Sequence, residues 1–319
     1  MAQPLPHRNG RLEREWANGL LCGSPCITAP CALLPGRRPM RIPAPRPCRD
    51  DPPFFRILGP LEIGPAAGAL PLRAERQKLI LATLLLNADC VVTIARLIDA
   101  VWGEQPPSTA RGQVHICISR LRHRLAESGQ GDCGIETRPH GYVLHTGPGD
   151  VDLKVFRREV AAAELAEARG NPAEAAELYR TALALWRGPA LSGLDGEAMR
   201  SAAAQLDEER MAVAEQRIEL ELRLGRHRAL VPELTGLVGE YPLNERLTGY
   251  LMTALHRSGR QAEALASYRR ARNRLADELG LRPGRELQAL ERAILCPDGG
   301  PADDPGRRPP PGRDGPRRA

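Results

Sequence analysis

STARGQVHICISRLRHRLA, residues 108–126, is the stretch that decides the fold, because it combines two different faces on one predicted helix. At 100° per residue, the apolar side chains gather on one side of that helix. This predicted core side is made of Ala110, Val114, Cys117, Ile118, Leu121 and Leu125. Ser108 is a favourable N-cap, so we expect the helix to begin there and to run to about residue 126.

The other side of this helix is polar and basic. On it or at its borders lie Arg111, Gly112, His115, Ile116, Ser119, Arg120, Arg122, His123 and Arg124. No acidic residue lies between Arg111 and Arg124, so the positive charge is not compensated locally. An isoleucine is unfavourable on a solvated surface, but Ile116 could contact a thymine methyl group. A merely solvated surface helix would show the same period, so periodicity alone leaves that alternative open.

The segments around this helix have the order of a winged helix. Strands are predicted at 54–58, 61–63, around 70–72, 91–93, 135–138 and 142–145, and helices at 74–88 and 94–102. The buried side of the first helix is predicted to carry Leu79, Ala82, Leu85 and Leu86. The closing hairpin would hold Arg138 and His140 at its tip, where they can reach the minor groove or its phosphates.

From residue 151 onward the chain has a helical period and an internal repeat. Two similar segments are GNPAEAAELYR at 170–180 and GRQAEALASYR at 259–269, and LGRH at 224–227 lies 34 residues before SGRQ at 258–261. That period is typical of tetratricopeptide repeats. Glycine fits the tight turn between paired helices, and Tyr179 and Tyr268 are expected to pack between turns.

The composition favours a helical protein without a membrane span. Of the 319 residues 42% are hydrophobic but only 3% aromatic, which disfavours an aromatic-rich β sandwich. No apolar run reaches about 18 residues and no secretion signal is recognisable, so we expect a cytoplasmic protein. The net charge of +6 is compatible with nucleic-acid binding without identifying it. Residues 1–52 and 297–319, rich in Pro, Arg and Gly, are expected to be disordered, and Met40 is an alternative start.

The sequence gives little support to an enzyme or a metalloprotein. Its eight cysteines include no CxxC pair, and no Cys/His pairing has zinc-finger spacing. The motifs of phosphate-binding loops, dinucleotide-binding folds, zinc proteases and serine hydrolases are absent. Asp195 and Glu197 are neighbouring carboxylates, but a turn between helices accounts for them. We therefore expect no catalytic residue, no cofactor and no metal.

Seven motifs together resemble one protein family. The first four are FFRILGPLE (54–62), LIDAVWGEQPP (97–107), ISRLRHRL (118–125) and TRPHGYVL (137–144). They resemble the winged helix of the Streptomyces antibiotic regulatory proteins. That winged helix is itself similar to the DNA-binding half of OmpR-type response regulators. Three more resemble the bacterial transcriptional activator domain that accompanies this winged helix: ALALWRGPAL (182–191), SGRQAEALASYRRARNRLA (258–276) and DELGLRP (277–283). The resemblance covers residues 54 to 295.

The resemblance implies a mainly α protein with a small α+β part. An N-terminal winged helix-turn-helix domain would occupy residues 53–147, and an all-α, tetratricopeptide-like activator domain would follow at 151–296. The helix at 108–126 would enter the major groove, and Tyr142 would brace the wing. The candidate DNA contacts are Arg111, His115, Ile116, Ser119, Arg120, Arg122, His123, Arg124, Arg138, His140 and Tyr142.

The resemblance also implies the partners and the process. The partners would be double-stranded DNA with short direct repeats near promoters, RNA polymerase with its sigma factor, and a second copy of the chain as a homodimer on the DNA. The controlled genes would form a secondary-metabolite, or antibiotic, biosynthetic cluster. The alternative is a protein-interaction adaptor that uses the helical repeats and has lost DNA binding, which a binding assay at low salt would detect.

Overall fold

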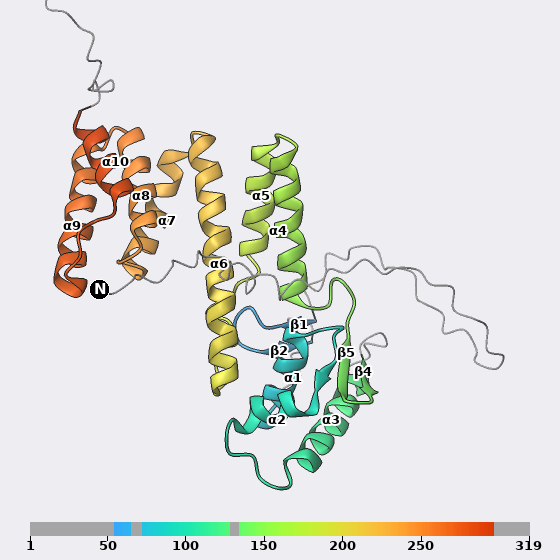
Figure 1. Ribbon diagram of the computed structural model, residues 1–319. Helices are drawn as coiled ribbons and strands as arrows, with labels where there is room; N and C mark the ends of the chain where they lie inside the picture. The colour runs from blue at the N-terminus through green and yellow to red at the C-terminus, as the bar shows by residue number, and fades with distance from the viewer. Residues whose placement is uncertain (1–53, 65–71, 128–133, 297–319) are drawn as a thin grey trace, which may run out of the picture. The chain divides into compact units, whose positions relative to one another are not determined.

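The computed structural model describes residues 54–64, 72–127 and 134–296 (Figure 1). The predicted disorder of residues 1–52 and 297–319 lies outside these ranges, and so do residues 70 and 71 of the third predicted strand. Leu72 is described and lies in no strand. Over the described residues the protein is mainly helical with a small β part, which confirms the predicted fold class.

Up to His145, the described residues form three helices and five short strands. In chain order these are β1 (Phe55–Arg56), β2 (Glu62–Ile63), α1 (Glu75–Leu86), β3 (Val92–Thr93), α2 (Ile94–Trp102), α3 (Ala110–Glu127), β4 (Gly134–Arg138) and β5 (Gly141–His145). β1 pairs with β2, and a second antiparallel sheet has the order β3-β5-β4. The hairpin β4–β5 lies beside α3 (Figure 1). This arrangement is the predicted winged helix.

The bounds of α2 agree with the prediction, whereas α3 begins later than predicted. Thr93 caps α2, since its hydroxyl oxygen accepts a hydrogen bond from the Arg96 amide at 3.2 Å. The chain before α3 forms a turn, in which the Ala110 amide donates to the Pro107 carbonyl at 2.9 Å. The helix therefore starts at Ala110, and the predicted start at Ser108 is wrong.

The helix α1 is buried on more sides than its sequence period indicates. Leu79, Ala82 and Leu85 are buried as predicted, but Leu86 is only half-buried. The additional buried side chains of this helix are Gln77, Ile80, Leu81, Thr83 and Leu84. Because α2, α3 and β5 all pack against α1, the prediction of a single buried side is wrong.

From Val151 to Cys296 the described residues form seven helices. These are α4 (Asp152–Ala168), α5 (Pro172–Leu183), α6 (Glu197–Arg223), α7 (His227–Glu240), α8 (Glu245–Arg257), α9 (Gln261–Leu279) and α10 (Arg285–Leu295). The pairs α4–α5 and α8–α9 pack side by side (Figure 1).

Three turns between these helices share one geometry. Gly170, Gly225 and Gly259 have φ values of 80°, 79° and 80°, a conformation that favours glycine. After each glycine, the next amide donates to a carbonyl in the last turn of the preceding helix, at 3.0, 3.0 and 2.9 Å respectively. The matching turns confirm the repeat that the sequence predicted.

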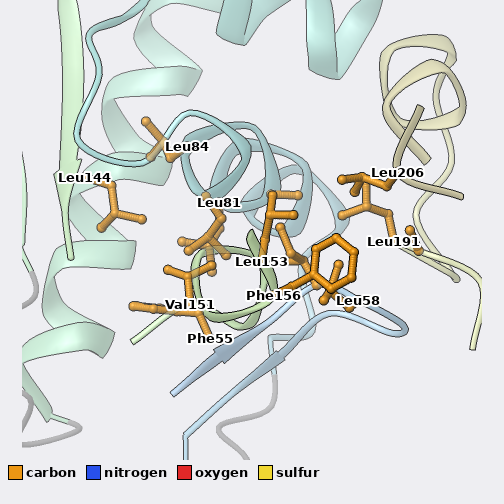
Figure 2. Close-up of a cluster of buried hydrophobic side chains, with 14 of the residues drawn as sticks. Phe55, Leu58, Leu81, Leu84, Leu144, Val151, Leu153, Phe156, Leu191 and Leu206 are labelled. Carbon is orange, nitrogen blue, oxygen red and sulfur yellow. The ribbon is translucent and has the colours of Figure 1, made fainter. Parts of the chain in front are cut away.

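Within the described ranges, the buried hydrophobic side chains form two clusters. Tyr179 lies in one cluster and Tyr268 in the other, and both are buried as the repeat predicted. The cluster around Tyr179 also contains side chains from the winged helix. Figure 2 shows part of this cluster, including Phe55 of β1, Leu81 of α1 and Phe156 of α4. The winged helix and the first helices of the repeat therefore share a core.

A buried carboxylate joins the β1–β2 hairpin to α4. Asp152, the first residue of α4, is 1% exposed and accepts hydrogen bonds from the amides of Ile57, Leu58 and Leu153 at 2.8–2.9 Å. Burial raises the pKa of the Asp152 carboxyl, while these amides and the Arg187 guanidinium, 3.8 Å away, act against that shift. The first hairpin of the winged helix is thus fixed by a side chain far along the sequence.

Candidate nucleic-acid interface

The helix α3 has the two faces that its sequence predicts. All six residues of the predicted core side are buried: Ala110, Val114, Cys117, Ile118, Leu121 and Leu125. The other side is open to solvent, and its exposed residues are Arg111, His115, Ile116, Ser119, Arg120, Arg122, His123 and Arg124. Ile116 is 54% exposed, which is unusual for an isoleucine without a partner.

The tip of the wing carries both predicted side chains, Arg138 and His140, together with an acid that pairs with Arg138. Arg138 and His140 are exposed at the turn between β4 and β5. The Arg138 guanidinium lies 2.8 Å from the Glu136 carboxylate, which also contacts Nε2 of His145 at 2.8 Å. The hydrogen bond from His145, followed by the charge of Arg138, lowers the pKa of Glu136. Among the described residues, no acidic side chain pairs with His140, whereas Arg138 is paired with Glu136.

Tyr142 is buried between the wing and α3. Its side chain is 3% exposed, and its hydroxyl lies 2.5 Å from Nδ1 of His115. The Arg122 guanidinium lies over the Tyr142 ring, 5.8 Å from its centre. Tyr142 thus packs against two positions of α3 that are two turns apart, and its burial makes it a positioning residue rather than a direct contact.

Arg122 connects α3 to the first strand of the wing. Its Nε donates to the Ile135 carbonyl at 2.8 Å, and its Nη2 donates to the Thr137 hydroxyl at 2.7 Å. These bonds use N–H donors of a guanidinium that the sequence predicts to contact DNA. They depend on how β4 packs on α3, and the helical period of the sequence carries no information about that packing.

The remaining basic side chains of α3 differ in whether an acidic side chain pairs with them. His123 lies 3.2 Å from the Glu127 carboxylate, one turn further along α3. Within the described ranges, Arg111, Arg120 and Arg124 have no acidic partner. The exposed side of α3 therefore brings together Ser119, Ile116 and three guanidinium groups that lack an acidic partner in the described part of the chain.

Arg76 is a neighbouring cation that the sequence analysis did not single out. It lies in the first turn of α1, is exposed, and donates from Nη1 to the Gln113 side chain of α3 at 2.5 Å. Its guanidinium also stacks on the half-buried Trp102 ring, 5.5 Å from the ring centre. No feature of the α1 sequence indicates this neighbour, because the contact depends on how α1 and α3 cross.

Two family models match the chain. Residues 72–144 match the model described as transcriptional regulatory protein, C terminal, and residues 151–295 match the bacterial transcriptional activator domain. Regulatory protein DnrI of Streptomyces peucetius is 36% identical over 253 residues, which are 77% of this chain and 93% of DnrI. The chain belongs to the Streptomyces antibiotic regulatory protein family. The resemblance predicted from the seven motifs is confirmed.

Other relatives of the family are longer than the matched region. Regulatory protein AfsR of Streptomyces griseus is 38% identical over 279 residues, which are 86% of this chain but only 28% of AfsR. A solved structure of EmbR from Mycobacterium tuberculosis, in complex with a low affinity phosphopeptide, has a TM-score of 0.71 at 35% identity. That likeness covers 77% of this chain and 65% of the EmbR chain.

The family models and the names of the relatives describe regulators of transcription. RedD of Streptomyces coelicolor is named a transcriptional regulator, and DnrI is named a regulatory protein. In the described ranges, every helix is too short or too polar to cross a lipid bilayer.

We expect Arg122→Lys to loosen the wing without removing its positive charge. An ammonium group cannot reproduce the two hydrogen bonds from Nε and Nη2, so the free energy of unfolding should fall by about 1 kcal/mol. Hydrogen exchange at the β4 amides should become faster. Arg124→Lys is the matched control, and equal effects of the two substitutions would contradict this role of Arg122.

Proposed function

We propose that the protein is a sequence-specific DNA-binding activator that inserts α3 into the major groove of double-stranded DNA. The observation that carries the proposal is the exposed side of α3, which presents several arginines with no acidic residue between Arg111 and Arg124. A solvated surface helix would gain nothing from an exposed Ile116 at the centre of that side. An apolar contact with a thymine methyl would explain why Ile116 is exposed.

Different residues of the interface suit different contacts. Ser119, Arg120 and Ile116 lie near the middle of the exposed side of α3, where base edges would be met. Arg111 and Arg124 lie at the borders of that side and suit the phosphates on either side of the groove. His123, Arg138 and His140 are further candidates, the last two from the wing towards the minor groove.

Arg76 adds a phosphate contact to this assignment. Its contacts with Gln113 and Trp102 leave further N–H donors of the guanidinium unused. Its side chain is held on the same side as the start of α3, which supports a contact with the backbone of the DNA.

The helical module is the part to which we assign contacts with proteins. A cavity of about 850 Å³ lies between α6, α8 and α10, and its lining includes Leu222, Leu287, Leu290 and Arg285. Together with family membership, this favours an activator that contacts RNA polymerase and its sigma factor. We further propose that two copies bind direct repeats near promoters of a secondary-metabolite gene cluster. Footprinting of the full chain on those promoters, with purified polymerase added, tests both points.

Arg120→Ala is expected to weaken binding to the preferred sequence by about 1–3 kcal/mol and to relax the base preference at one position. Binding to unrelated DNA should change far less. Competition gel shifts with single-base variants of the footprinted site would measure both effects. Arg269→Ala, which removes an exposed arginine from α9, is the control. If Arg120→Ala lost the same affinity on every duplex, Arg120 would have no base-specific role.

The adaptor alternative is decided by the same assay. If Arg–phosphate contacts hold the complex, its affinity must fall steeply as salt rises, because binding releases counterions from the DNA. A full chain that shifts no duplex at low salt would favour the adaptor, whose partners would then bind the helical module.

A further inference from the structure

One short contact ties an exposed histidine of α3 to a buried tyrosine of the wing. Nδ1 of His115 lies 2.5 Å from the hydroxyl of Tyr142, and the two rings meet edge to face with centres 6.1 Å apart. His115 is exposed while Tyr142 is 3% exposed. The contact therefore fixes the orientation of a side chain that faces outward from the recognition helix.

The contact also decides which ring nitrogen of His115 carries hydrogen. If Nδ1–H donated to the hydroxyl, the phenolic hydrogen would need another acceptor, and the described part of the chain provides no second partner for this oxygen. A buried polar hydrogen without an acceptor is unfavourable. If instead the hydroxyl donates to Nδ1, every hydrogen is satisfied. The neutral imidazole then carries its hydrogen on Nε2.

Nε2 lies on the other side of the ring from the Tyr142 contact, and within the described ranges it has no partner. A single N–H donor distinguishes base edges in the major groove. It can pair with N7 or O6 of guanine, N7 of adenine or O4 of thymine, but it meets another donor at N4 of cytosine.

We propose that His115 recognises an acceptor atom on a base edge through Nε2–H, and that Tyr142 is the positioning residue that fixes this tautomer. The proposal rests on the proposed function of α3 as the recognition helix. It makes Tyr142 part of DNA selectivity although its side chain is buried.

The tautomer is measured without DNA. Two-bond ¹H–¹⁵N correlation spectra of the full chain, with imidazole signals assigned through His115→Gln, report which nitrogen carries hydrogen. We expect Nε2–H for His115 in the wild type and a mixture of tautomers in Tyr142→Phe. Predominant Nδ1–H in the wild type would overturn the proposal.

The DNA contact is tested by replacing the ring with amides that mimic one nitrogen each. The amide nitrogen of His115→Gln takes the place of Nε2, so base preference should stay within about threefold of the wild type. The nitrogen of His115→Asn takes the place of Nδ1, so preference at one base pair should fall by about tenfold, as it should in Tyr142→Phe. In His115→Asn and Tyr142→Phe, affinity for random duplex should change less than base preference does, and thermal unfolding shows that each variant is folded.

The outcomes separate this proposal from the function on which it rests. A wild-type chain that binds every duplex alike would overturn the proposed function. A selective wild type whose base preference survives in His115→Asn and Tyr142→Phe would overturn the role of His115 alone.

Discussion

Gly141→Ala is expected to destabilise the winged helix by about 3 kcal/mol or more. Gly141 begins β5 and pairs with Thr93 of β3. A Cβ at this position would lie 2.0 Å from the Val92 carbonyl oxygen, 2.7 Å from its carbon and 2.9 Å from the Cα of Thr93. All three atoms belong to the backbone, so no side-chain rotation relieves the overlap. The strand β3 must move away from β5, and its ladder hydrogen bonds are lost.

The control for this substitution lies in the same hairpin. Gly134 begins β4, pairs with His145, and has nothing within 4 Å of the position where a Cβ would stand. Gly134→Ala should therefore change the free energy of unfolding by less than about 0.5 kcal/mol. Denaturant unfolding of the two variants measures the difference. DNA binding should be lost only in Gly141→Ala, since β3 and β5 hold the wing beside α3, and equal stability of the two variants would contradict this account.

The sequence predicts an element well when one side of it is buried and the other is solvated. α2 and the core side of α3 follow from the helical period, because only one side of each helix is buried. α1 lies between α2, α3 and β5, so apolar residues surround it and the period that would mark one buried side is lost. The start of α3 depends on a turn at Pro107, for which the cap residue Ser108 was a poor guide.

The sequence predicts which residues of the candidate interface are exposed, but not the contacts that these residues make with one another. The exposed positions of α3 follow from the same period that gives its core side. The roles of Arg122 and Tyr142 depend on the packing of β4 and β5 against α3, and the contact of Arg76 depends on the crossing of α1 and α3. Such contacts join residues from different elements, and no local pattern encodes them.

The link between the β1–β2 hairpin and α4 is a long-range contact of this kind. Asp152 and Ile57 are 95 positions apart, yet the carboxylate of one holds the amide of the other. From the sequence, residues 54–58 are predicted as a strand of the winged helix alone. In the structure, the backbone of this strand also bonds to Asp150, Arg187 and Leu191, so the hairpin is held by the helical module as well.

Asp152→Ala is expected to lower the free energy of unfolding by about 3–5 kcal/mol. The substitution leaves the amides of Ile57, Leu58 and Leu153 without their buried acceptor. Asp152→Asn keeps the size of the side chain and one acceptor oxygen, but its NH₂ group must face an amide donor, so about half of that loss is expected. Since burial raises the pKa of this carboxyl, the charged form is stable only while those donors surround it.

Glu164→Ala is the matched control, because Glu164 is an exposed acid on the same helix. Its expected effect is below about 0.5 kcal/mol. Hydrogen exchange locates the damage: protection should be lost first at the amides of Ile57 and Leu58, and then in α1, whose core is shared with α4. If the Asp152→Ala chain unfolds like the control, the hairpin must be held by its apolar contacts alone. Loss of protection confined to α4 would likewise show that the Asp152 carboxylate does not hold β1 on the helical module.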